Sequence, residues 1–428
     1  MSEYEHSKNN LNIQKYGILD EFNTALNHVK CVLEDPQHSV FIFHDNDSDG
    51  LCSYLLLKNS YPTIKRGHFI TKEIESQEIA LQHIPEQTTH VICVDTPSIE
   101  TSILTKLTSL YNVIILDHHV LDNNKKQFID ELISQNKLTY VNPLDYNSKD
   151  SRPVTYFCYL LSNKSEQDVQ FALIGTIADF YITPLLIDIE QMLNNSKNEN
   201  QSHSLSILFN HFNTFTTQTL HYITQTLREN TLYYLEENNK QENAKYVQML
   251  TFSTQIGKLK FFFDFIFKNT TTAQTSIHLI EQFSLFELLG EINSGSQGVF
   301  FEFDKYYKKY QKIIQSAYSK FKVADKQQLY IIIEHKGKTS YNRQLSEQAL
   351  YELDIDVAFS LHQRFRRGFI SGSFRSKPHI NLHTILNKVF EGIDNANWGG
   401  HNNACGCSFL SDDKELVISR FIELMNKK

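Results

Sequence analysis

The stretch "HDNDSDG", residues His44 to Gly50, constrains the fold of this chain more than any other. It places three carboxylates within five positions, and carboxylates so close repel one another unless a cation lies between them. The apolar run Val40–Phe43 before it favours a buried strand, and Leu51–Lys58 after it favours a helix. The order strand, acidic turn, helix predicts an α/β site at the carboxyl end of a strand, where open parallel sheets bind their ligands.

The same spacing matches the first half of an EF-hand calcium loop, which is therefore tested first. An EF-hand needs a bidentate Glu at the twelfth loop position, and counting from Asp45 that position is Leu56. It also needs a helix before the loop, where this chain has a predicted strand. The sequence therefore excludes an EF-hand.

Three predicted strands run into an aspartate. The strand candidates are Val40–Phe43, Val91–Val94, Val113–Leu116 and Leu138–Val141. The first three lead to Asp45, Asp95 and Asp117. If these strands are parallel neighbours, their carboxyl ends meet at one edge of a sheet, and we expect the three acids to share a cation site.

Length and composition limit the class of protein. A chain of 428 residues is long enough for two or three domains with a real core. The polar, acidic start predicts no secretory signal, and no apolar run approaches the roughly 18 residues that span a bilayer. We therefore expect a cytoplasmic protein without a membrane partner.

The net charge limits how the chain could bind a nucleic acid, and the cysteines indicate whether it forms disulfides or a zinc site. A net charge of −8 argues against a generally basic nucleic-acid coat, so we expect any polyanion at a local patch. Four of the nine arginines lie between Arg364 and Arg375. The six cysteines are scattered, and Cys405-x-Cys407 lacks the partner pair of a structural zinc site, which predicts reduced thiols.

The composition and the predicted secondary structure of the chain change near residue 186. The polar tract from Met192 to His203 predicts a loop, and apolar positions from Leu220 to Tyr234 indicate helix in an insertion that runs to about 290. A lysine-rich amphipathic helix is expected over Phe303–Lys322; a solvated linker face is the simpler interpretation, and a nucleic-acid contact is the alternative. A final α/β segment follows, with strands over Gln328–Glu334, 357–361 and 368–374 and a helix near 414–426.

The motif "VIILDHH" adds Asp117, His118 and His119 at the third strand end. Adjacent histidines after an aspartate suit a metal site, because one imidazole can ligate while the next faces a substrate and the aspartate orients a ring. The order "DNDSDG", "VDTP", "LDHH" resembles the DHH phosphoesterase superfamily, which includes RecJ-type single-strand exonucleases, nanoRNases and family II pyrophosphatases. The fourth motif of that family corresponds to "ALIGTIAD", which ends at Asp179. Taken alone, an aspartate there predicts a helix C-terminal cap.

The C-terminal segment also resembles this family. "GGHNNACG", Gly399 to Gly406, is similar to the glycine-rich signature of the associated C-terminal domain of RecJ and nanoRNases, and "SGSFRS" resembles its strand-borne Arg-Ser. Physically, glycines let backbone N–H groups approach a phosphate, and Arg or His side chains add charge-assisted hydrogen bonds. The substrate-binding residues implied are Arg375, Ser376, Gly399, Gly400 and His401.

The resemblance implies a fold and a metal centre. The fold is α/β: a parallel-sheet DHH domain (1–185), a helical insertion and linker (186–325) and a smaller C-terminal α/β domain (326–428), with the active-site cleft between the two α/β domains. The implied ligands of two Mn²⁺ ions, with Mg²⁺ as the alternative, are Asp47, Asp49, Asp95, His118 and Asp179. Asp95 would bridge the ions, and His119 would contact the scissile phosphate. The implied catalytic residues are His119 and Asp117, with Asp117 and Asp45 placed to support the site from behind the ligands.

Three positions depart from the family pattern. Phe43 stands where many members carry a metal-binding histidine, with His44 one position along. Gln297 stands where an arginine of the RecJ connector falls, which puts a substrate contact there in doubt. Cys405 replaces an alanine, a tolerable change of size.

The resemblance leaves several functions open. The leading one is a manganese-dependent exonuclease that hydrolyses single-stranded DNA or RNA, in DNA repair for example. A phosphodiesterase for short oligonucleotides or cyclic dinucleotides is the alternative, and a family II pyrophosphatase fits less well because its C-terminal domain has no Gly-Gly-His loop. A replication-associated scaffold is the rival from another class, and residues 186–300 could bind a replication or repair protein in either case.

Overall fold

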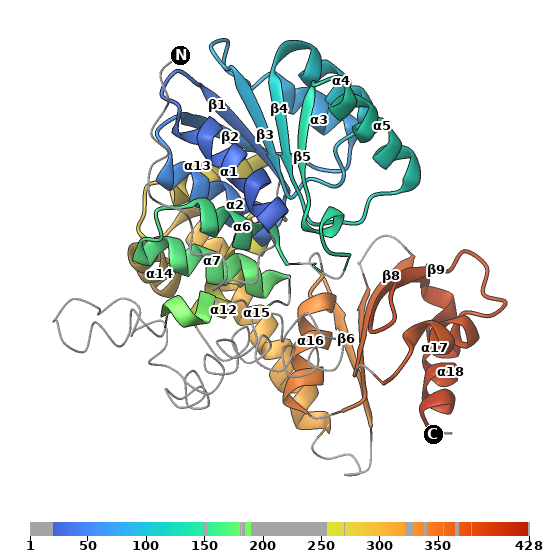
Figure 1. Cartoon of the computed structure of the whole chain (residues 1–428). Coiled ribbons are helices and arrows are strands. Elements are labelled where there is room, and N and C mark those ends of the chain that lie inside the picture. Colours follow the sequence, from blue (N-terminus) through green and yellow to red (C-terminus); the bar gives the residue numbers. More distant parts are fainter. Residues whose placement is uncertain are drawn as a thin grey trace. The chain divides into compact units, whose positions relative to one another are not determined.

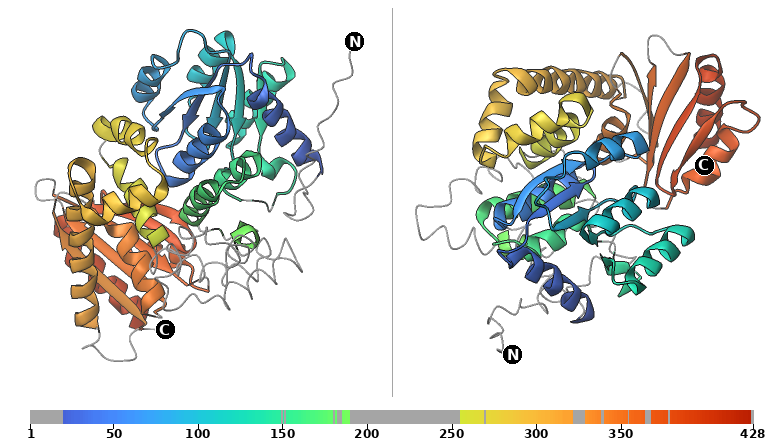
Figure 2. Two further views of the ribbon diagram at one scale, coloured as in Figure 1. Left: turned by 90° about the vertical axis from the view of Figure 1, so that its left-hand side faces the viewer. Right: turned by 90° about the horizontal axis from the view of Figure 1, so that it is seen from above.

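The computed structural model describes residues 20–148, 150, 152–179, 181, 185–189, 255–268, 270–321, 329–337, 340–353, 355–363, 368–377 and 379–426. The chain divides into two compact units, Met1–Ser294 and Gly295–Lys428. Figures 1 and 2 show a sheet with covering helices in each. No described helix is both long and apolar enough to cross a membrane.

The first unit is built on a parallel sheet with the strand order β2-β1-β3-β4-β5. Its strands are β1 (Val40–His44), β2 (Ile64–Phe69), β3 (His90–Val94), β4 (Asn112–Leu116) and β5 (Leu138–Val141). The chain moves from β1 outward to β2, then returns to the other side of β1 to form β3. The strand order therefore reverses between β1 and β3, which is where doubly wound sheets bind ligands.

Helices cover both faces of this sheet (Figure 1). The described helices of the first unit are α1 (Asp20–Glu34), α2 (Ser48–Ser60), α3 (Ile74–Leu81), α4 (Thr101–Leu110), α5 (Asn123–Ser134), α6 (Val154–Leu161), α7 (Glu166–Ala178), α12 (Gln255–Ile266), α13 (Thr270–Ile280) and α14 (Leu285–Ser294), with a 3₁₀ turn at Pro143–Asp145. Alternate strand residues such as Phe41, Val91 and Ile115 join a hydrophobic core with Leu104 of α4 and Ile129 of α5. Strands buried on both faces are the expected form of a helix-covered parallel sheet.

The second unit contains a mixed sheet with the order β6-β7-β8-β10-β9. Its strands are β6 (Tyr330–Lys336), β7 (Val357–Gln363), β8 (Phe369–Ser376), β9 (Asn397–His401) and β10 (Ala404–Leu410), and only the β6–β7 pair is parallel. Its helices are α15 (Gly298–Phe321), α16 (Asn342–Glu352), α17 (Leu382–Val389) and α18 (Lys414–Asn426), with a 3₁₀ turn at Ser411–Asp413. Phe359 and Phe374 stack at 3.8 Å in a core that also includes Leu386 of α17 and Phe421 of α18.

The predicted α/β fold, with a parallel sheet first and a second sheet in the C-terminal region, is confirmed. All four predicted strands of the first sheet exist within one residue of their expected ends. Strand β2 was not predicted, because Lys65, Arg66 and His68 break the apolar pattern in a strand at the sheet edge. The stretch Gly399–His401 was predicted as a loop, but it belongs to β9, which pairs in a hairpin with β10.

Several predictions lie on residues that the structure does not describe. These are the loop from Met192 to His203, the helix from Leu220 to Tyr234, and Arg364, Arg366 and Arg367. The three-segment division of the chain, including the cleft between its α/β domains, stays a prediction. The described part of the middle segment is helical, with α12, α13 and α14 in the first unit and α15 in the second.

Candidate metal centre

Strand register places the three predicted acids at one level of the first sheet. His44 of β1 pairs with Val94 of β3, and Val94 pairs with Leu116 of β4. The next residue in each strand is therefore an aspartate at the carboxyl edge, on three adjacent strands. The expectation that these strands are parallel neighbours is confirmed, and their acids converge as parallel strand ends must.

The acidic turn is held by its own backbone. Asp47 is the N-cap of α2, and its Oδ1 accepts a hydrogen bond of 2.9 Å from the Gly50 backbone N–H. Asp45 Oδ1 accepts one of 2.8 Å from the Asn46 N–H. A Cβ on Gly50 would lie 2.7 Å from the backbone N of Asp45, so only glycine lets the helix start against the strand end. Short side chains and a glycine thus fold this turn into a compact array of carboxylates.

Asp95 occupies an unusual backbone conformation. Its φ is 58°, in the left-handed region that non-glycine residues seldom adopt, although Asp does so more readily than most. Its N–H bonds the Leu116 carbonyl at 3.0 Å, which ties the end of β3 to the end of β4. Strain of this kind concentrates at functional sites. Here it points a buried carboxylate into the space beyond the strand ends.

The Asp-His-His turn is ordered around Asp117. Its Oδ1 accepts the backbone N–H of His118 at 2.8 Å and lies 2.9 Å from Nδ1 of His119. Asn142, just after β5, donates from Nδ2 to the His119 carbonyl at 2.9 Å. Asp117 therefore orients the second histidine and the turn itself, and its predicted role stays a prediction.

His118 brings the carboxylates of three elements together. Its Nε2 lies 3.2 Å from Asp179 Oδ2, 3.5 Å from Asp95 Oδ1 and 3.8 Å from Asp49 Oδ2. Asp179 is the C-cap of α7, so the cap that the sequence predicted by itself also faces the site. His118 is buried, whereas the side chain of His119 is 40% exposed.

Asp49 is held by the start of α6. Its carboxylate accepts the backbone N–H groups of Val154 at 3.1 Å and Thr155 at 2.9 Å, and it also bonds the Thr155 hydroxyl. These are the first two residues of the helix, so the carboxylate satisfies N–H groups that lack a partner within α6. Asp49 is fully buried, and this contact fixes its orientation.

Burial and mutual repulsion disfavour the charged forms of the clustered carboxylates. Burial, followed by the charges of Asp49 and Asp47, raises the pKa of Asp95 well above its ordinary value. Burial and then the Asp179 charge raise the pKa of Asp47, and the same causes raise that of Asp49 to about 6. The pKa of His118 is also raised: burial lowers it, but the bonds to Asp179 and Asp95 outweigh burial. A bound cation would relieve this repulsion.

The donor set fits a hard divalent cation. Among the described residues, three groups offer ligand atoms within 4.8 Å of one another: Asp95, His118 and His119; Asp49, His118 and Asp179; and Asp45, Asp47 and Asp95. Carboxylate oxygens and imidazole nitrogens without thiolate suit Mn²⁺ or Mg²⁺. Asp95 belongs to two groups. Asp45, which was predicted to support the site, belongs to the third group.

The other predicted site residues all belong to the second unit. Arg375 donates from Nε and Nη2 to Glu347 Oε1 at 3.1 and 3.0 Å, and from Nη1 to Ser373 Oγ and the Phe374 carbonyl. Ser376 is buried and donates to the Ile380 carbonyl at 3.0 Å. These contacts are structural, and the predicted substrate contacts remain predictions.

The two glycines of the predicted pair differ in how strictly the β9–β10 hairpin requires them. A Cβ on Gly400, whose φ is 138°, would lie 2.3 Å from the Ala404 carbonyl oxygen, whereas one on Gly399 would meet nothing within 4 Å. Gly400 is therefore required by the β9–β10 pairing, and Gly399 is not. His401 follows at the end of β9.

Comparison with known proteins identifies the part of the first unit that carries the parallel sheet. Residues 39–170 match the family described as the DHH family, N-terminal domain. This region is a DHH-family domain. The predicted membership of the DHH superfamily is thereby confirmed, and the acidic turn, Asp95, Asp117 and both histidines lie inside the DHH domain. No curated protein sequence matches the chain.

Solved structures share the fold. The Mn²⁺ complex of RecJ from Thermus thermophilus is 14% identical with a TM-score of 0.50, over 96% of this chain and 55% of that one. This chain thus spans about half the length of that RecJ. A manganese-bound exonuclease RecJ (15%, TM-score 0.47, 96% and 95% covered) and CDC45 from Entamoeba histolytica (11%, 0.42, 94% and 99%) also match. At such identities the likeness to Thermus RecJ shows the fold alone.

Sequence reasoning missed the residues that position the DHH site. Thr155 stands 106 residues from Asp49, and Asn142 stands 23 from His119. Ser48, inside the acidic turn, donates to Asp264 of α12 at 2.6 Å, and Lys260 pairs with that same carboxylate at 3.0 Å. The only local signal was Pro153 at the N-cap of α6, since proline is common at helix starts.

Proposed function

We propose that this protein is a divalent-metal-dependent phosphodiesterase, and specifically a RecJ-like exonuclease that hydrolyses single-stranded DNA or RNA. The observation that carries this proposal is the convergence of Asp49, Asp95 and Asp179 on His118, with Asp47 grouped beside Asp95. All of these residues except Asp179 lie within the DHH-family region 39–170. A protein that only scaffolds a complex has no need of buried acids that repel one another.

The residues proposed to hold two divalent ions are Asp47, Asp49, Asp95, His118 and Asp179. Asp95 and His118 each belong to two of the three groups. Asp95 is the better candidate for a shared ligand, because a carboxylate has two oxygens to offer to two ions whereas the Nε2 atom of an imidazole is a single donor. When bound, ions of this kind activate a water for in-line attack on phosphorus and neutralise charge on the phosphate oxygens. Mn²⁺ suits a site with several carboxylates and an imidazole, and Mg²⁺ is the alternative.

His119 is proposed to contact the scissile phosphate. Its Nδ1 is engaged by Asp117 at 2.9 Å, so Nε2 is the ring nitrogen that would meet a phosphate oxygen. The partly exposed ring is consistent with access to a substrate. A donor held in this way stabilises charge that develops on the phosphate during the reaction. Asp117 would act through His119 by fixing its orientation.

Two parts of the proposal lie outside the metal centre: one rests on the family resemblance, and the other rests only on the extra length of the chain. Substrate contacts from Arg375, Ser376 and the glycine hairpin at 399–401 are expected from the family motif. A replication or repair protein is proposed to bind residues 186–300, most of which lie outside the described residues. A pull-down in which deletion of the insertion leaves partner recovery unchanged would contradict the latter.

The test compares wild-type protein with Asp95→Asn. Asparagine keeps the size of the side chain and accepts the left-handed backbone, so the fold should persist while the charge is lost. End-labelled single-stranded DNA, single-stranded RNA and a dinucleotide are incubated with Mn²⁺, Mg²⁺ or a chelator. We expect progressive shortening of a long strand with metal, and a loss of at least about 100-fold in the variant.

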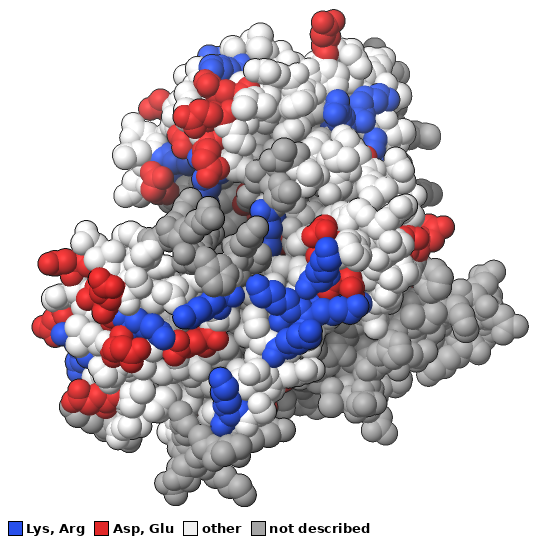
Figure 3. All heavy atoms as spheres, turned by 180° about the vertical axis from the view of Figure 1, so that it is seen from behind, with Lys and Arg blue, Asp and Glu red and all other residues white. Residues whose placement is uncertain are grey.

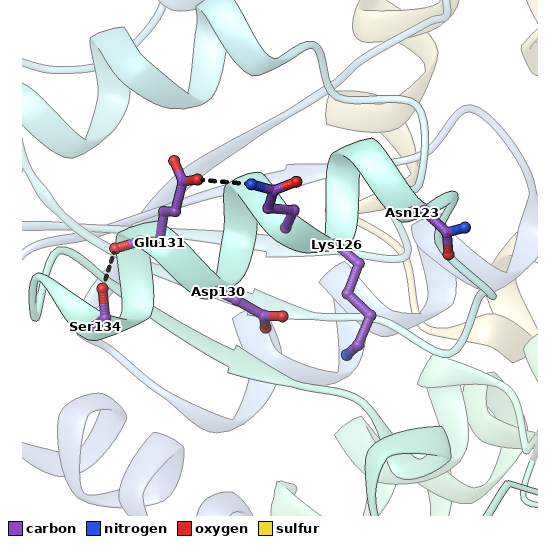
Figure 4. Close-up of a pocket in the computed structure, with 6 residues that line it drawn as sticks. Asn123, Lys126, Asp130, Glu131 and Ser134 are labelled. Atoms are coloured by element: carbon purple, nitrogen blue, oxygen red, sulfur yellow. Dashed lines mark hydrogen bonds between the residues drawn. The ribbon is translucent and has the colours of Figure 1, made fainter.

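The matched control is Asp130→Asn. Asp130 lies on α5, in a shallow pocket whose polar side chains bond their own neighbours, as Figure 4 shows for Glu131 and Ser134. Activity of this control should equal wild type. Cleavage of the dinucleotide alone would favour a short-oligonucleotide phosphodiesterase. Absence of cleavage with Mn²⁺ binding intact by calorimetry would refute the nuclease proposal and favour a scaffold.

A further inference from the structure

The outer edge of the second sheet carries a groove separate from the DHH site. β6 pairs with β7 on one side, and no described strand pairs with its other side. A groove of about 780 Å³ follows this edge, and every residue from Tyr330 to Lys336 lines it. α15 forms one wall, and Ile422 of α18 contributes from the opposite face of the sheet.

Lysines from α15 and β6 give the groove a positive charge. Lys309, Lys312 and Lys320 project from one face of α15, and Lys336 ends β6; all four are exposed, and none has an ion pair with a described residue. Glu334 is the single acid in the lining, and it is already paired with Lys414. Figure 3 shows basic side chains gathered on the face along which α15 runs.

The spacing along α15 separates two sets of lysines. Positions 309, 312, 313, 316, 317 and 320 line the groove at the intervals of one helical face. Lys305 and Lys308 face elsewhere and pair with Glu302 at 3.4 Å and Asp304 at 2.7 Å. The lysines outside the groove are thus neutralised by neighbours on the helix, and those lining it are not.

The floor of the groove is apolar and extended. Ile313, Ala317 and Phe321 of α15 line the groove together with Ile332 of β6, whose side chain lies on the face of the sheet that packs against the α17–α18 core. Seven strand residues span about 20 Å, and the helix from 309 to 320 rises about 16 Å, which together accommodate an added strand of roughly six residues. An edge strand presents backbone N–H and C=O groups that another extended chain can pair with.

We propose that this groove binds an extended acidic segment of a partner protein, which adds to the sheet as a strand beside β6. Backbone pairing with β6 supplies affinity, and the unpaired lysines select for Asp or Glu side chains. A nucleic acid could use the lysines but has no alternating N–H and C=O groups to pair with the strand edge. Acidic side chains on an extended peptide use both features of the groove.

The test measures binding of a fluorescent peptide to the full chain by anisotropy. The probe is a peptide of about eight residues that alternates Asp and Val; matched probes carry Lys in place of Asp, or N-methyl groups on alternate residues. A 20-nucleotide oligothymidylate is measured in parallel. Hydrogen exchange follows the backbone amides of β6 with and without the acidic probe.

We expect the acidic peptide to bind, with slowed amide exchange in β6, and the lysine and N-methylated peptides to bind about tenfold more weakly or worse. The double variant K312E/K320E should weaken binding by a similar factor, whereas K305E/K308E, with the same charge change on the same helix, should not. Equal melting temperatures establish that both variants fold.

Three outcomes would overturn the proposal. Equal binding of the N-methylated peptide would exclude strand addition. Tight oligothymidylate binding that K312E/K320E abolishes, without acidic-peptide binding, would assign the groove to nucleic acid. No binding of any probe would mean that the lysines only protect the sheet edge from pairing, a common role for lysine at such positions.

Discussion

A methyl group added to Gly175 should disturb the candidate metal centre without touching it. Gly175 lies in α7 where this helix crosses α6, and a Cβ there would lie 2.2 Å from the Thr155 hydroxyl oxygen and 2.7 Å from its methyl carbon. Real Cβ contacts are never that short. Thr155 must therefore move, and with it the hydroxyl and N–H groups that hold Asp49.

The expected cost follows from three contributions. Overpacking a tight core costs about 1–3 kcal/mol. Replacement of glycine by alanine inside a helix stabilises the folded protein by about 1 kcal/mol. Loss of a hydrogen bond to a buried carboxylate costs about 1.5–3 kcal/mol. Gly175→Ala should therefore lower the free energy of unfolding by about 2–5 kcal/mol, and it should weaken Mn²⁺ binding about 10–100-fold, because Asp49 is no longer oriented.

The assay pairs chemical denaturation with Mn²⁺ titration calorimetry, and Gly290→Ala is the control. Gly290 also lies within a helix of the first unit, α14, but a Cβ there meets nothing within 4 Å. That substitution should stabilise the protein by about 0.5–1 kcal/mol and leave Mn²⁺ affinity unchanged. If Gly175→Ala behaves like Gly290→Ala, the α6–α7 contact does not position Asp49 and the reasoning fails.

Three further predictions concern the second unit. Burial, and then the neighbouring His362 charge, lowers the pKa of His335 to about 4. Between about pH 6.5 and 4 the unfolded chain therefore binds more protons than the folded one. The free energy of unfolding should fall by about 3 kcal/mol as the pH drops through that window. Denaturation at both ends of the window should show less loss in His335→Gln; an identical loss would contradict this. Arg375→Ala should lower the free energy of unfolding by about 1–3 kcal/mol because it deprives buried Glu347 of a partner, and a change confined to KM would instead support a purely substrate-binding role. Gly400→Ala should cost about 2 kcal/mol or more in thermal denaturation while Gly399→Ala is tolerated; equal effects would contradict the hairpin geometry.

The local sequence pattern determined the central strands of the first sheet and the acids at their ends. Short apolar runs predicted β1, β3, β4 and β5, because strands buried on both faces need little more than contiguous apolar side chains. The acids that follow three of these strands converge for a topological reason: parallel neighbours end at the same edge. The DHH assignment and the cluster of candidate metal ligands could thus be reached from short motifs, in each of which the residues are close together in the chain.

Tertiary structure alone decided how the candidate metal ligands are oriented, and which contacts Arg375 and the glycine pair make in the second unit. Asp49 is oriented by Thr155, and Gly175 is required by that same contact, yet both lie more than 100 residues away from the acidic turn. Arg375 is tied to Glu347, and the glycine pair forms a strand instead of a loop. Such contacts depend on which helix faces cross and which strands pair, and neither is encoded by the spacing of residues within a single element.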